Sequence, residues 1–240
     1  PPPPPPPPPC FTQKTSNAIR LGLVGSEMCI RDRVQSGFPL RNTTFEGGVY
    51  SQLVLNPPKD QSIELHNVSF IDCRIVDGTA IISEGVTLKE VQFINLHCSD
   101  ALEIDTRASL ENVKVVGNRK PQMIWLHSTD RTEHSWPSAG ENSCYIDISE
   151  YHGEVSITGI STSSIRINPA EHFLIELPRF QQADWNEINV PPLSFWRVRA
   201  KLVAASGSKS GIFSLDFKDG PQRVEALEEL EVLKSYGVMK

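Results

Sequence analysis

The chain has 240 residues, with 23 Lys and Arg against 29 Asp and Glu, which gives a formal net charge of −6. This acidic balance offers no basic stripe that could release counterions from phosphates, so the sequence predicts no nucleic acid partner. Its apolar runs are all shorter than the roughly 18 residues that a membrane-spanning helix needs, so no membrane span is expected.

Residues 1–33 differ in character from the rest of the chain. They open with nine prolines and end in LVGSEMCIRDR at 23–33. This last segment resembles the translation of a transposase adapter from a sequencing library, and QKT at 13–15 resembles part of the primer upstream of it. A proline run is also typical of a polyproline II linker. The resemblance implies that residues 1–33 are a disordered, non-native artefact, and that the natural amino terminus and any signal peptide are missing.

A repeat begins after this segment. Four stretches align without gaps, and their leucines lie 25, 23 and 22 residues apart: LRNTTF at 40–45, LHNVSF at 65–70, LKEVQF at 88–93 and LENVKV at 110–115. Each is followed by a second short apolar stretch, at 52–55, 80–82, 101–104 and 123–126. Apolar and polar residues alternate with period 2, which predicts strands rather than helices.

A coil of about 22 residues with three short strands resembles the right-handed parallel β-helix of the pectate-lyase-like superfamily. One coil cannot bury its inward residues alone, but stacked coils bring equivalent positions about 4.8 Å apart. The last repeat position is then expected to form an interior stack of Phe45, Phe70, Phe93 and Val115. The third position is expected to form a bend where Asn accepts the left-handed conformation, at Asn42, Asn67 and Asn112, with Glu90 interrupting the ladder.

Past residue 126 a polar loop over 127–143 interrupts the repeat, and strands are expected again at 145–148, 155–160, 164–167 and 173–177. We therefore predict an all-β fold, with a parallel β-helix of five to six coils over residues 34–177. Residues 178–240 are predicted to form a hairpin, with Phe195–Ala204 facing Gly211–Phe217, and then a helix over Pro221–Tyr236. This tail either caps the open end of the β-helix or begins a further domain.

Three cysteines lie outside residues 1–33, at Cys73, Cys98 and Cys144. An odd number without a CxxC pair predicts buried free thiols rather than a disulfide framework or a zinc site. His66, His152 and His172 lie in strand-like stretches, and we interpret them as surface or edge residues.

Stacked coils would bring polar residues into columns at the turns after the Phe strand. The columns are Asp72, Asn95 and Gly117; Arg74, His97 and Arg119; and Asp77 with Asp100. Enzymes of the resembled superfamily act on acidic or neutral polysaccharides along one outer face, so an acidic column beside a basic one indicates a possible sugar-acid site. The alternative is a turn whose charges only keep it solvated.

The loop after residue 126 is the second candidate site. Two histidines and two carboxylates lie close together there, flanked by two tryptophans: His127, Asp130, Glu133 and His134, with Trp125 and Trp136. Such a set could bind a divalent metal, and exposed tryptophans could stack on sugar rings. The spacing matches no metal motif, so no metal site is assigned, and the alternative is an ordinary polar loop.

The sequence thus predicts a β-helical binding or structural module that presents loops to a glycan or protein partner. The alternative is a fragment of a polysaccharide lyase or glycoside hydrolase. No catalytic set and no cofactor are assigned, and an extracellular or cell-surface location is favoured. The candidate binding residues are Asp72, Arg74, His97, Asp100, Arg119, Trp125, His127, Asp130, His134 and Trp136.

Overall fold

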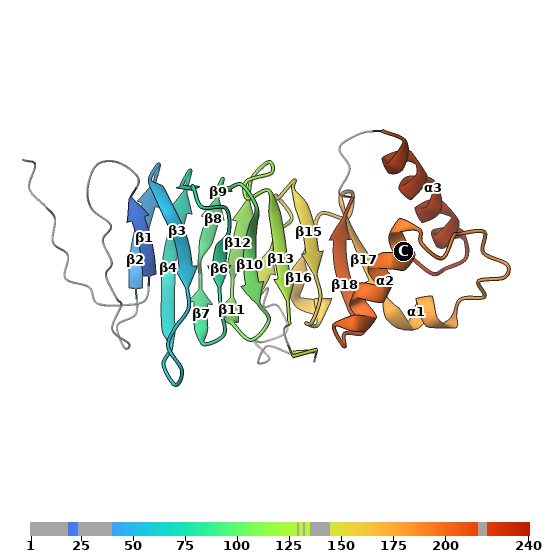
Figure 1. The fold of residues 1–240 in the computed structure, drawn as a ribbon, viewed down its shortest axis with the longest axis horizontal. Coiled ribbons are helices and arrows are strands. Elements are labelled where there is room, and N and C mark those ends of the chain that lie inside the picture. The colour runs from blue at the N-terminus through green and yellow to red at the C-terminus, as the bar shows by residue number, and fades with distance from the viewer. Residues whose placement is uncertain (1–18, 24–39, 129, 132, 135–144, 216–219) are drawn as a thin grey trace, which may run out of the picture.

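The computed structural model describes residues 19–23, 40–128, 130–131, 133–134, 145–215 and 220–240. Short strands stack into a parallel β-solenoid of about five turns, and helices gather at its carboxyl-terminal end (Figure 1). The predicted fold class is therefore confirmed.

Within the described residues, the larger sheet has ten strands. Its order is β17-β18-β15-β13-β10-β6-β3-β5-β9, with β1 on the free side of β3. The pairs are parallel except those of β1 with β3 and of β18 with β15 and β17. The strands are β1 (Ile19–Leu23), β3 (Val49–Leu55), β5 (Arg74–Ile75), β6 (Ala80–Ile82), β9 (His97–Cys98), β10 (Ala101–Asp105), β13 (Met123–His127), β15 (Glu154–Ile157), β17 (His172–Glu176) and β18 (Ser210–Ser214).

The second sheet has eight strands in the same residues and is parallel throughout. Its order is β11-β7-β4-β8-β12-β14-β16, and β2 pairs with β4. The strands are β2 (Leu40–Glu46), β4 (Ile63–Ile71), β7 (Val86–Lys89), β8 (Gln92–Ile94), β11 (Ser109–Glu111), β12 (Val113–Val116), β14 (Ile146–Asp147) and β16 (Ile165–Arg166).

The predicted stacking register is confirmed. The repeat leucines pair from coil to coil, in the order Leu40, Leu65, Leu88 and Leu110. Inside the solenoid, the ring of Phe70 lies 5.1 Å from that of Phe45 and 5.4 Å from that of Phe93, with interplanar angles of 11° and 9°. Equivalent residues of successive coils stack because each coil buries the apolar face of the next.

The predicted bend is also confirmed. Its four residues have left-handed backbones, with φ of 50° to 55°: Asn42, Asn67, Glu90 and Asn112. The Asn67 amide donates a hydrogen bond to Asn42 Oδ1 at 2.8 Å, so the side chains form the first step of a ladder. Glu90 interrupts the amides as expected, yet its backbone follows the same left-handed path.

The predicted hairpin is wrong, because Phe195–Ala205 forms helix α2. The Ser194 side chain caps this helix by accepting a hydrogen bond from the Arg197 N–H, and Trp196, Ala200 and Val203 bury one helical face. Strand β18 pairs instead with β17 and β15. The predicted helix after Pro221 is confirmed as α3 (Pro221–Ser235), and the remaining helices are α1 (Leu177–Gln182) and the 3-10 turn η1 (Thr162–Ser164).

Two apolar cores share strand β18. One core fills the solenoid and includes Ile212, whereas the other lies among the helices and includes Phe213 and Trp196. Because successive side chains of a strand point to opposite faces, β18 contributes to both. The strand also covers the edge of β15 by antiparallel pairing, as a cap would.

At the other end, Ile19–Leu23 forms β1, so the expected disorder of residues 1–33 is wrong for these five residues. The edge of β3 offers unpaired backbone groups, which a further strand satisfies. The rest of residues 1–33 lies outside the described residues, and the adapter resemblance stays a prediction. The helices of the described residues are all too short or too polar to cross a membrane.

Cys73 and Cys98 are buried free thiols, as predicted. Burial raises the pKa of Cys98 to about 12, so it remains a neutral thiol packed in the core. Cys144 lies outside the described residues.

His172, interpreted from the sequence as a surface or edge residue, is in fact buried at the start of β17, with 2 % of its surface exposed. Its Nδ1 accepts a hydrogen bond from the Asn168 N–H at 3.2 Å, which requires an unprotonated nitrogen. Its Nε2 is buried without a partner. Burial lowers the pKa of His172 from 6.5 to about 4, so the folded protein holds this imidazole neutral.

We expect this histidine to make stability depend on pH. Between about pH 6.5 and pH 4 the unfolded chain binds a proton that the folded chain refuses, so stability falls as the pH is lowered through this window, by about 2 to 3 kcal/mol. Urea unfolding at half-unit pH steps measures the loss. His172→Gln should flatten the curve, and equal slopes in the two proteins would contradict the assignment.

Candidate functional site

The first predicted column forms a second bend of the coil. Asp72 and Asn95 have φ of 51° and 50°, and the Asn95 amide donates a hydrogen bond to Asp72 Oδ1 at 3.1 Å. Gly117 continues the column with φ of 152°, where an added Cβ would lie 2.5 Å from the Lys120 carbonyl oxygen. Backbone geometry thus explains these residue types without a ligand.

The basic column follows the bend. Arg74 and His97 pair in register between β5 and β9, and Arg119 Nη1 lies 3.9 Å from Glu154 Oε1. The Asp100 carboxylate lies beside Gly78, so a side chain at Gly78 would require this carboxylate to move. The stacking predicted for Arg74 and His97 is therefore present, while a role in binding stays a prediction.

Trp125 and His127 lie on the outer face of β13. Ile124 and Leu126, between and beside them, are fully buried, so alternation turns Trp125 and His127 outward. The Trp125 side chain is 41 % exposed, and its ring stacks on that of His127 with centroids 4.2 Å apart and an interplanar angle of 24°. His127 Nε2 lies 3.0 Å from Glu103 Oε1 on β10. The exposed indole is thus held in one orientation.

A guanidinium and two carboxylates adjoin this aromatic pair. Asp105 is the in-register neighbour of His127, and it accepts hydrogen bonds from Arg107 Nε at 3.0 Å and Arg107 Nη2 at 2.7 Å. Arg107 Nη1 also lies 2.7 Å from Glu84 Oε2. Burial alone would raise the pKa of Asp105, but the hydrogen bonds and charge of Arg107 outweigh it and hold the pKa below its usual value.

The polar loop divides its side chains among separate partners. His134 Nε2 lies 3.0 Å from Asp130 Oδ2, whereas Glu133 accepts a hydrogen bond from the Lys209 N–H at 2.7 Å. Over the described residues, three or more His, Cys, Asp or Glu side chains nowhere gather as a metal site would require. Trp136 lies outside the described residues.

We call the outer surface formed by Glu103, Asp105, Arg107, Trp125 and His127 the β10–β13 face. The sequence singled out the two aromatic residues but not the charged ones. A signal for them existed, because Glu103 and Asp105 precede Trp125 and His127 by one 22-residue coil and pair with them in register.

A pocket of about 460 Å³ lies over the eight-stranded sheet, near the Asn bend. Its charged residues are paired: Lys114 Nζ lies 2.7 Å from Glu150 Oε1, and Arg166 Nη1 lies 3.0 Å from Asp147 Oδ2. The residues lining this pocket include no aromatic side chain, so the β10–β13 face is the better candidate.

Comparison with models of protein families, with curated proteins and with solved structures finds no match. The fold itself therefore defines the class, which is a β-helical structural module.

Proposed function

We propose that this β-helical module binds a glycan on the β10–β13 face. The observation that carries the proposal is the Trp125 ring, which is exposed on a rigid sheet and fixed by the stacked ring of His127. A flat exposed indole suits the apolar face of a sugar ring, and the neighbouring carboxylates and guanidinium suit its hydroxyl groups. The resemblance of the coil length to pectate-lyase-like β-helices supports the same ligand class.

The charges of the face favour a neutral glycan over an acidic one. Glu103 and Asp105 of the face and the adjacent Glu84 supply three carboxylates, and Arg107 is already bound to Asp105 and Glu84. A uronic acid polymer would meet this excess of negative charge and be repelled. We therefore expect a neutral polysaccharide such as a β-glucan to bind more tightly than polygalacturonate.

Trp125→Ala is expected to weaken β-glucan binding by about tenfold or more, because it removes the stacking platform and releases the His127 ring. Isothermal titration calorimetry with soluble oligosaccharides measures the affinity, and retardation in polysaccharide-containing gels tests the polymers. Folding should be little affected, since Trp125 lies on the outer face of the sheet and is 41 % exposed.

The matched control is Tyr236→Ala, which removes another exposed aromatic side chain, 52 % exposed, at the end of α3. It should bind glycans as the unchanged protein does. Equal affinities of the Trp125→Ala and unchanged proteins would show that the β10–β13 face is not the binding site, and tighter binding of polygalacturonate would overturn the preference for neutral sugars.

A further inference from the structure

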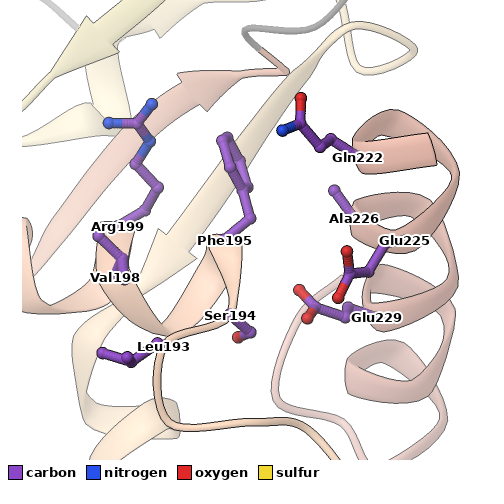
Figure 2. Close-up of a pocket in the computed structure, with 9 residues that line it drawn as sticks. All are labelled: Leu193, Ser194, Phe195, Val198, Arg199, Gln222, Glu225, Ala226 and Glu229. Atoms are coloured by element: carbon purple, nitrogen blue, oxygen red, sulfur yellow. The ribbon is translucent and has the colours of Figure 1, made fainter. Parts of the chain in front are cut away.

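A different pocket lies between helices α2 and α3 (Figure 2). Its volume is about 330 Å³. It is lined by Leu193, Ser194, Phe195, Val198, Arg199, Gln222, Glu225, Ala226 and Glu229.

Glu229 is the unusual residue of this pocket. Only 8 % of its surface is exposed, and its carboxylate accepts hydrogen bonds from the Phe195 N–H and the Ser194 hydroxyl at the start of α2. Its Oε2 atom is buried without any partner. Burial, followed by the charge of Glu225 one turn away, raises the pKa of Glu229. A buried carboxylate oxygen without a donor is costly, so a donor that reaches Glu229 Oε2 would gain a strong interaction.

The surroundings define the charge of that donor. Figure 2 shows the Glu225 and Glu229 carboxylates pointing from α3 toward Ser194, while the Arg199 guanidinium lies on the other side of the Phe195 ring. The guanidinium carbon of Arg199 is 4.8 Å from the centre of that ring. The carboxylate side of the pocket is therefore acidic. The other walls are apolar, with Val198 partly exposed and Leu193 largely exposed.

We propose that the pocket binds a primary alkylammonium group, which donates to Glu229 Oε2 beside Glu225, with its alkyl chain against Phe195 and Val198. A guanidinium prefers both oxygens of one carboxylate, but the Phe195 N–H and the Ser194 hydroxyl already bind the Glu229 carboxylate. A single free oxygen suits the compact ammonium charge instead.

The test titrates the full chain with n-butylammonium at pH 7 and follows backbone amide shifts by NMR. Glu229→Gln should weaken binding at least about tenfold, because it removes the charge that faces the ammonium. Glu228→Gln is the matched control, since Glu228 directly precedes Glu229 on α3 and is exposed, so its substitution removes the same charge outside the pocket. Its affinity should equal that of the unchanged protein.

Two further measurements test the ammonium site, with a second variant and with other ligands. If Glu229→Gln fails to fold, as judged by circular dichroism, Glu225→Gln on the exposed rim should still weaken binding about threefold. n-Butylguanidinium should bind more weakly than n-butylammonium, and butyrate should not bind. No shifts at α2 and α3 with n-butylammonium, or equal affinity in the Glu229→Gln and Glu228→Gln proteins, would overturn the site.

The alkylammonium group could come from a free amine or from a lysine side chain. A blocked Gly-Lys-Gly peptide distinguishes these sources. Binding of the peptide at least as tight as that of n-butylammonium assigns a lysine of a protein partner, and weaker binding assigns a small amine, while either order supports the ammonium site.

Discussion

Phe70→Ala is expected to lower the free energy of unfolding by about 3 to 5 kcal/mol. The ring is 1 % exposed and lies between those of Phe45 and Phe93 at 5.1 and 5.4 Å, so its removal leaves a cavity between two coils. The rigid ladder of parallel strands on either side limits the collapse of that cavity. Urea unfolding followed by circular dichroism measures the change.

The same substitution at the end of the stack is the control. Phe45 is only partly buried, and its ring stacks on one other ring, that of Phe70. Phe45→Ala should therefore lower the free energy of unfolding clearly less than Phe70→Ala. A midpoint for Phe70→Ala near that of the unchanged protein would mean that the last repeat position does not face the core. Equal costs at both positions would mean that the solenoid tolerates cavities uniformly.

The solenoid was predictable because its repeat encodes the register directly. Residues one coil apart must stack, so the spacing of 22 to 25 residues predicts that Leu65 pairs with Leu88 and Phe70 with Phe93, as the structure shows. The bend was predictable for a related reason, because Asn is the non-glycine residue that best accepts a left-handed backbone.

The helix α2 was not predictable from local pattern. Trp196, Val198, Ala200 and Leu202 alternate with Arg197, Arg199 and Lys201, which is a strand pattern as much as a helical one. Burial decides between the two, since the core takes Trp196, Ala200 and Val203 and leaves Val198 and Leu202 partly exposed. The pocket between α2 and α3 could not be anticipated either, because a strand in place of α2 would not form it.

The candidate site was half predictable. Trp125 and His127 are candidate binding residues by residue type alone. Glu103 and Asp105 become candidates only through the coil spacing that pairs them with Trp125 and His127. Burial of His172 depends on the pairing of β17 with β18. The sequence predicted instead that the segment of β18 pairs with residues 195–204 in a hairpin. Errors in the carboxyl-terminal segment thus spread to the residues that pack against it.

Trp196→Ala is expected to cost about 3 to 5 kcal/mol in the carboxyl-terminal core. The side chain is fully buried, its Nε1 donates a hydrogen bond to the Ala226 carbonyl of α3 at 2.7 Å, and its ring meets that of Phe173 at 5.1 Å. One residue therefore joins α2, α3 and β17. Trp125→Ala removes the same side chain from an exposed position and should cost about 0.5 kcal/mol or less.

Hydrogen exchange measured by mass spectrometry shows which elements lose stability in the Trp196→Ala protein. The two apolar cores adjoin along β17 and β18, whose neighbouring residues point to opposite faces. The amides of α2 and α3 should therefore lose protection first, while those of β4 and β8 keep it. Loss of protection by the same factor in both cores would mean that they unfold as one unit. In that case β18, which pairs with β15, transmits the damage, and the helices stabilise the whole solenoid rather than only its last coil.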